Sequence, residues 1–319
     1  MISECAKAGF QALRAPLAAG LTVTVLVGAA VAGPFENATL AYDRGDYATA
    51  MRIIGPLAEQ DDATAQYNLG NLYYNGRGVK RDYAEALKWF RKAADQGYAN
   101  AQHNLGILYY KGWGVQQDDA EALKWFRKAA DQGLAKTQYN LGILYYNGRG
   151  VEQDYAEALK WLRKAADQGN TSAQNNLGSM YEKGQGVPQD YAEALKWYRK
   201  AADQGNTFAQ NNLGSMYYNG HGMQQDYAEA LKWYQKAAEQ GHAGAQSNLG
   251  AMYQHGQGVP EDMVRAHMWV NLAGSHDYLD AQNARKLRDT IAERMSPVQI
   301  AEAQKLAREW TPTSGRGIR

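Results

Sequence analysis

The sequence predicts an all-α fold, a solenoid in which antiparallel helix pairs stack one after another along the chain. The first observation is a motif, A-Q-x-N-L-G, that returns every 36 residues or at a multiple of 36, with no insertion between copies. The copies begin at Ala65, Ala101, Thr137, Ala173, Ala209 and Ala245. The second observation is that each copy holds two stretches of helical periodicity separated by a loop with two glycines. Because one such unit cannot bury its apolar face alone, we expect six units over residues 65–280 to stack on one another.

In the first unit, the first predicted helix has one apolar face, with side chains at i, i+4, i+7 and i+8. That face consists of Ala65, Leu69, Leu72 and Tyr73. Gly70 lies inside this helix, where glycine lowers helix stability, so we expect it to permit the close approach of a neighbouring helix. Residues 75–78 read Asn-Gly-Arg-Gly and end the helix, since both glycines can adopt a positive φ.

The second predicted helix of the unit begins after Asp82, whose carboxylate can cap it. Glu85 follows three residues later and completes a pattern that resembles a capping box. The apolar face of this helix consists of Ala86, Trp89, Phe90 and Ala93. Gly97 ends the helix at the position where a left-handed residue is expected. In the sixth unit Arg265 replaces the glutamate, which indicates the approach to the end of the array.

The N-terminal segment, residues 1–32, has the pattern of a signal peptide. Lys7 and Arg14 precede an uncharged apolar run of 15 residues, from Leu17 to Val31, and Ala32 completes a small-x-small cleavage pattern. The run is shorter than the roughly 20 residues that span a bilayer, which favours cleavage near Ala32 over a retained anchor, although both remain open. We therefore expect a periplasmic or secreted protein. The single cysteine, Cys5, would leave with the signal peptide.

The remaining flanks read as the ends of the array. Residues 33–64 predict a shortened N-terminal helix pair, and residues 281–310 predict two capping helices. The second of these starts at Ser296-Pro297-Val298-Gln299, with serine as N-cap, proline at the first helical position and glutamine at the third. Residues 311–319 are predicted to be a disordered tail.

The repeat resembles the Sel-1-like repeat family, a relative of the tetratricopeptide repeat. In the second unit the matching residues are Ala101, Leu105, Gly106, Tyr109, Gly112, Gly114, Val115, Asp118, Ala122, Trp125, Ala129, Ala130 and Gly133. The resemblance implies a right-handed superhelix whose concave face is lined by the first helix of each unit. It also implies an adaptor or regulator, as in exported bacterial members that modulate sensor kinases or assist envelope assembly. One cysteine-rich branch has β-lactamase-like activity, but each of its units is closed by a disulfide that this chain lacks.

The analogy with tetratricopeptide repeats places candidate partner-binding residues on the first helices. In the first three units they are Tyr67, Asn71, Tyr74, His103, Ile107, Tyr110, Tyr139, Ile143 and Tyr146. The last three units present mainly Asn, Ser and Gln there. Aromatic residues dominate binding hot spots, so we expect a peptide or helix of a protein partner to bind in the N-terminal half. The alternative is that the tyrosines only pack between neighbouring first helices. Trp113, in the second unit's loop, is either a further contact or packs over its own helix pair.

Composition and motifs argue against other function classes. The 34 Lys and Arg residues balance 33 Asp and Glu residues, so we expect no nucleic-acid partner and contact with a membrane only through another protein. Known catalytic and phosphate-binding motifs are missing, and His221 and His255 give only a weak metal signal. We therefore expect no enzyme, no cofactor and no metal site. The expected partner is an envelope sensor or assembly factor. The alternative is a hydrolase of cell-wall or β-lactam substrates, as in the cysteine-rich branch.

Overall fold

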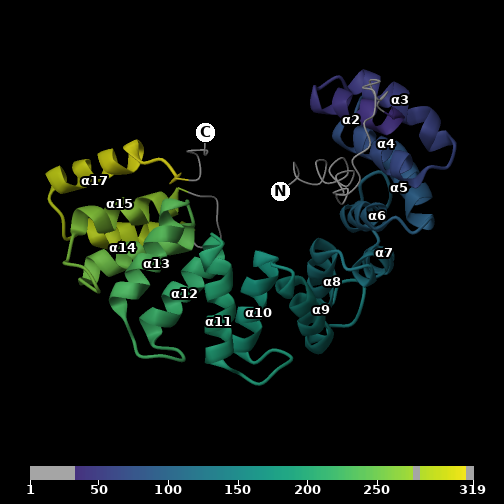
Figure 1. Cartoon of the computed structure of the whole chain (residues 1–319). Helices are drawn as coiled ribbons and strands as arrows, with labels where there is room; N and C mark the ends of the chain where they lie inside the picture. Colours follow the sequence, from purple (N-terminus) through teal and green to yellow (C-terminus); the bar gives the residue numbers. More distant parts are fainter. Residues whose placement is uncertain (1–32, 276–280, 314–319) are drawn as a thin grey trace, which may run out of the picture. The chain divides into compact units, whose positions relative to one another are not determined.

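The computed structural model describes residues 33–275 and 281–313, and these residues form 16 helices and no strand. Within residues 33–161 and within residues 162–275, successive helices run side by side (Figure 1). The predicted all-α fold of stacked helix pairs is therefore confirmed. The predicted signal peptide, residues 276–280 at the end of the predicted array and residues 314–319 of the predicted tail lie outside the described residues.

The chain divides into two compact units, of which unit 1 ends at Trp161 and unit 2 starts at Leu162. The helices of unit 1 are α2 (Pro34–Asp43), α3 (Tyr47–Glu59), α4 (Ala63–Asn75), α5 (Tyr83–Asp95), α6 (Ala99–Lys111), α7 (Asp119–Asp131) and α8 (Ala135–Asn147). Helix α9 (Tyr155–Asp167) contains the boundary. The helices of unit 2 are α10 (Thr171–Lys183), α11 (Tyr191–Asp203), α12 (Thr207–Asn219), α13 (Tyr227–Glu239), α14 (Ala243–His255), α15 (Met263–Gly274), α16 (Ala281–Ala292) and α17 (Pro297–Glu309).

Each repeat contributes a first helix, from α4 to α14 in even numbers, and a second helix, from α5 to α15 in odd numbers. In unit 1, α5 packs between α4 and α6, and α7 packs between α6 and α8. In unit 2, α11 packs between α10 and α12, and α13 packs between α12 and α14. Within residues 33–275 and 281–313, no helix is both long and apolar enough to cross a membrane.

A glycine in the first helix allows the two helices of a repeat to pack closely. A Cβ atom at Gly106 would lie 2.6 Å from Cε1 of Phe126 on α7, and the same distance separates a Cβ at Gly70 from the Phe90 ring on α5. These separations are well inside van der Waals contact. The expected role of the helical glycine is therefore confirmed, and the partner is the second helix of the same repeat.

The second helices are capped by their aspartates as predicted, but the capping box is incomplete. Oδ1 of Asp82 accepts from the backbone N–H groups of Ala84 and Glu85, at 2.9 and 3.0 Å. The Glu85 side chain, however, pairs with Lys88 at 3.4 Å instead of turning back to the N-cap. The prediction of a full capping box is wrong for this helix, because a lysine one turn away offers the carboxylate an opposite charge. The complete box predicted at Ser296 is present at the start of α17.

A buried glutamine in each A-Q-x-N-L-G motif joins consecutive repeats. In the second repeat, Nε2 of Gln102 donates to the carbonyl of Ala94 at the end of α5, at 3.1 Å. Oε1 of the same side chain accepts from Gln132 at 2.8 Å. The Gln102 amide therefore donates to a carbonyl at the end of α5 and accepts from the Gln132 side chain at the end of α7. A buried amide needs both kinds of partner, which explains why the motif has glutamine at this position.

The C-terminal helices close unit 2. Helix α15 packs against both α16 and α17, and the Trp269 and Trp310 rings meet edge to face with centroids 6.0 Å apart. The start of the predicted tail is held down, since Oγ1 of Thr313 donates to the carbonyl of Glu239 at 3.0 Å. Residues 314–319 lie outside the described residues, so the disorder of the tail stays a prediction.

Candidate partner-binding surface

Seven of the ten predicted partner-binding residues are half-buried. On the first helices these are Tyr74, Ile107, Tyr110, Tyr139, Ile143 and Tyr146, and the seventh, Trp113, lies in a loop. We call Ile107, Tyr110, Tyr139, Ile143 and Tyr146, on α6 and α8, the unit 1 strip. These residues follow one another at helical spacing on each helix, so they can face a common ligand.

The other three predicted residues are in the core, with exposed fractions of 0% for Tyr67, 4% for Asn71 and 5% for His103. Tyr67 packs against the ring of Tyr98, with centroids 5.0 Å apart. Oδ1 of Asn71 accepts from Asn104 at 3.3 Å. The prediction that these three side chains are available to a partner is wrong, because Tyr98, Asn104 and Thr137, about one repeat length further along the chain, cover or bind them.

His103 is buried in a way that keeps it neutral. Its Nδ1 lies 2.8 Å from Oγ1 of Thr137 on α8, and its ring packs against Phe126. Burial, assisted by the charge of Lys136, lowers the pKa of His103 to about 3. The contact between this neutral imidazole and the threonine hydroxyl joins the second repeat to the third.

The tyrosines near the end of the first helices lie at the joints between repeats. The Tyr74 ring contacts Tyr83 of its own repeat edge-on at 5.4 Å and Trp113 of the next repeat at 6.0 Å. The guanidinium of Arg149, from the third repeat, lies over the Tyr110 ring at 4.3 Å. Tyr74 and Tyr110 therefore pack between neighbouring repeats, as the alternative predicts. They also stay half-buried, so part of each side chain remains at the surface.

In the second, third and fifth repeats the variable loop residue contacts the first residue of the preceding second helix. Trp113 stacks on Tyr83, with centroids 5.1 Å apart and planes 16° apart. One repeat later Arg149 forms an ion pair with Asp119 at 2.9 Å. In unit 2, a histidine takes the loop position, and His221 stacks on the Tyr191 ring. Trp113 thus packs over the preceding helix pair and not over its own.

A glycine fixes this contact. Gly114 has a φ of +71°, and a Cβ there would collide with the backbone of Tyr83. The sequence contains a signal for this contact, because residues 30 positions apart are chemically matched: Tyr83 with Trp113, then Asp119 with Arg149. Such matching predicts contact between the loop and the preceding helix start.

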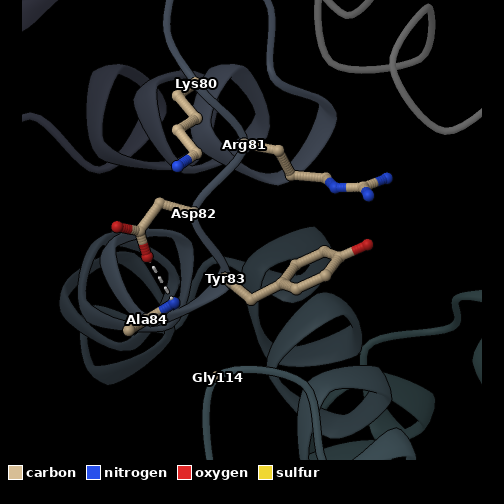
Figure 2. Close-up of a pocket in the computed structure, with 6 residues that line it drawn as sticks. All are labelled: Lys80, Arg81, Asp82, Tyr83, Ala84 and Gly114. Carbon is tan, nitrogen blue, oxygen red and sulfur yellow. Dashed lines mark hydrogen bonds between the residues drawn. The ribbon is translucent and has the colours of Figure 1, made fainter.

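A basic and aromatic hollow lies beside Trp113 in unit 1. It has a volume of about 400 Å³ and is lined by Lys80, Arg81, Asp82, Tyr83, Ala84 and Gly114 (Figure 2). The guanidinium of Arg81 lies over the Tyr83 ring at 5.4 Å. The carboxylate of Asp82 is occupied by the N-cap bond to Ala84. The hollow can therefore offer two cations and one ring edge to an acidic or aromatic side chain.

The comparisons with known proteins fit this architecture. A family model described as Sel1 repeat matches six consecutive segments, residues 63–98, 99–134, 135–170, 171–206, 207–242 and 243–278. The chain belongs to the Sel1 repeat family. As a Sel1 repeat protein, it has the tetratricopeptide-like helix-pair scaffold on which protein partners generally bind.

Three solved structures show what the chain is similar to. A Sel1 repeat protein from Oxalobacter formigenes is 35% identical, with a TM-score of 0.69 over 76% of this chain and 96% of that one. The protective antigen c5321 of uropathogenic Escherichia coli is 29% identical, with a TM-score of 0.40 over 88% and 76%. The immunity protein Pa5087 of Pseudomonas aeruginosa is 25% identical, with a TM-score of 0.42 over 72% and 81%. No curated protein matches the chain.

One of the two histidines with a weak metal signal, and the aspartates at the helix starts, have structural partners. Within residues 33–275 and 281–313, no three His, Cys, Asp or Glu side chains gather as a metal site requires. His221, one of the two histidines with a weak metal signal, stacks on Tyr191 and lies 4.0 Å from Oε1 of Glu182. The aspartates at the helix starts accept backbone N–H groups, as Asp118 does from Glu121 at 2.9 Å.

Proposed function

We propose that the chain is a scaffold or regulator in the bacterial cell envelope that binds a peptide or helix of a partner protein on the unit 1 strip. The observation that carries the proposal is the half-buried apolar patch of Ile107, Tyr139 and Ile143 on the neighbouring first helices α6 and α8. Half-buried aromatic and aliphatic side chains supply most of the affinity in protein interfaces, since they lose the rest of their solvent contact on binding.

The aromatic cluster beside the hollow provides a second anchor. Trp113 and Tyr74 are half-buried, and the cations of Lys80 and Arg81 lie at the adjacent hollow. An acidic or aromatic side chain of the partner can enter there while its helix contacts the unit 1 strip. We propose binding and not catalysis as the role of this surface. Turnover of the β-lactam nitrocefin by the purified chain would contradict that choice.

The envelope location rests on the N-terminal pattern of residues 1–32 and is a proposal in its own right. Cell fractionation followed by N-terminal sequencing tests it. We expect a periplasmic or secreted protein that begins at Gly33. Recovery of the chain in the cytoplasm with Met1 intact would contradict it. A partner such as an envelope sensor or assembly factor follows from this location.

Site-specific cross-linking tests the surface. A photo-crosslinking amino acid in place of Ile143 is expected to capture a partner in the periplasm, and mass spectrometry identifies it. The double variant Tyr139→Ala and Ile107→Ala should reduce capture about tenfold or more, because truncating one interface anchor commonly costs more than 1 kcal/mol.

The matched control is Leu306→Ala on α17, which also truncates an exposed apolar side chain. It should leave capture unchanged. Equal capture by the double variant, the control and the unmodified chain would refute the proposed surface.

A further inference from the structure

Unit 2 carries a line of asparagine side chains that crosses three consecutive first helices. The asparagine chain consists of Asn175 and Asn176 on α10, Asn211 and Asn212 on α12, and Asn248 on α14. Between helices, Asn248 donates to Asn211 at 3.1 Å and Asn212 donates to Asn175 at 3.0 Å. Within helices, Asn211 donates to Asn212 at 3.5 Å and Asn175 donates to Asn176 at 3.4 Å. The five amides thus form one directed series of hydrogen bonds.

The series leaves hydrogen-bonding capacity at each amide. A carboxamide has two N–H donors and two acceptor lone pairs. Asn175, Asn211 and Asn212 each use one donor and one acceptor within the series, so each keeps one of each kind. All five residues are half-buried, so each keeps part of its surface in contact with solvent. A donor and an acceptor on one rigid amide can pair with a matching donor and acceptor on a ligand, as asparagine does with adenine.

The side chains one turn further along the strip are small in unit 2. Ser179, Ser215 and Ala251 occupy the positions that hold Ile107 and Ile143 in unit 1. The hydroxyl of Ser215 is bound down, since it donates to the carbonyl of Asn211 at 3.2 Å. A main chain can therefore approach the amides of unit 2 more closely than the unit 1 strip allows.

We propose that the asparagine chain binds the backbone of an extended peptide segment of a partner protein. A peptide backbone is neutral and presents one N–H and one C=O per residue, which complements amides that each offer one acceptor and one donor. An extended chain rises about 3.3 Å per residue, so several consecutive residues of such a segment can lie along the asparagine chain. Recognition of this kind tolerates many sequences, because main-chain hydrogen bonds supply the affinity.

This site is separate from the unit 1 strip in residues and in chemistry. The strip offers rings and aliphatic groups to side chains, whereas the asparagine chain offers amides to a backbone. Either site can therefore fail its test while the other passes.

A random 12-residue peptide library, displayed on phage and selected on the full chain, tests the proposal. Each selected peptide is measured against Asn211→Leu, which keeps the side-chain volume and removes the amide, and against Tyr139→Ala in the unit 1 strip. The control Asn104→Leu removes the comparable bond between Asn104 and Asn71 in unit 1. A second test variant, Ala251→Ile, fills the space above the asparagine chain without removing an asparagine. Circular dichroism confirms that each variant is folded.

We expect a class of peptides that binds Asn211→Leu and Ala251→Ile about tenfold more weakly, and that binds Tyr139→Ala and Asn104→Leu as well as the unmodified chain. Methylating backbone nitrogens of these peptides should abolish binding, whereas replacing their side chains with alanine should change it little. The absence of any such class would overturn the proposal. Binding of chitotetraose that depends on Asn211, without such peptides, would also overturn it and indicate a glycan site.

Discussion

A methyl group added at Gly106 tests whether the repeat is held together as described. The Cβ of Gly106→Ala would lie 2.6 Å from Cε1 of Phe126, a ring that is only 1% exposed. Overpacking of this kind costs about 1–3 kcal/mol. Alanine is a better helix former than glycine by about 1 kcal/mol, which offsets part of that cost. Because the ring has no room to move, we expect an overpacking cost in the upper part of that range, about 2–3 kcal/mol, which leaves a net loss of about 1–2 kcal/mol.

The double variant with Phe126→Leu separates the two contributions. Leucine removes the ring edge nearest the new methyl group, and the third repeat already has leucine at this position, Leu162. In that background Gly106→Ala should be neutral or stabilising by up to about 1 kcal/mol, as helix propensity alone predicts.

Urea unfolding followed by far-UV circular dichroism measures these differences, and midpoints are compared because a repeat array can unfold in segments. The thermal midpoint of Gly106→Ala should fall by about 2–8 °C, at 2–4 °C per kcal/mol. An equal effect of Gly106→Ala in both backgrounds would refute the close-packing argument.

Three further predictions follow from unit 1. Trp113→Ala should lower stability by about 1–2 kcal/mol through loss of the stack on Tyr83, and an unchanged urea midpoint would contradict the stack. A double-mutant cycle with Asp119→Ala and Arg149→Ala should give a coupling energy of about 0.5–1 kcal/mol that shrinks in high salt, because the pair is partly exposed. His103 has a pKa of about 3 when folded, below its ordinary 6.5, so the unfolded chain binds the extra proton first. The contribution of neutral His103 to the free energy of unfolding is therefore present above pH 6.5 and is lost as the pH falls toward 3. In His103→Asn the urea midpoint should depend less on pH over that range.

Much of the local structure could be predicted from the residues alone. The aspartate N-caps, the loop glycines and the period of the repeat act within a few residues of one another, so a single copy contains the information that sets them. The glutamate of the expected capping box shows the limit of this reasoning, because Glu85 had a competing partner, Lys88, on the same helix face.

The candidate surface could be predicted only in part, because exposure depends on residues one repeat away. Tyr67 and Tyr139 occupy the same position of the repeat, yet Tyr67 is fully buried and Tyr139 is half-buried. Tyr98 packs on Tyr67, whereas the residue 31 positions after Tyr139 is Asn170. The position in the repeat gives the direction of a side chain, and a residue about 30 positions further along the chain decides whether that side chain is covered.

By itself the sequence determined the fold class, the length of the repeat and the helix ends. These features depend on local caps, turns and a spacing of apolar residues that recurs in every copy of the repeat. Tertiary structure decided which variable residues meet. It paired the Trp113 loop with Tyr83, placed His103 against Thr137 and joined Asn212 to Asn175 across helices. These pairs are 30 to 37 residues apart, and their contact depends on how one helix pair stacks on the next. The sequence of a single repeat therefore does not predict these contacts.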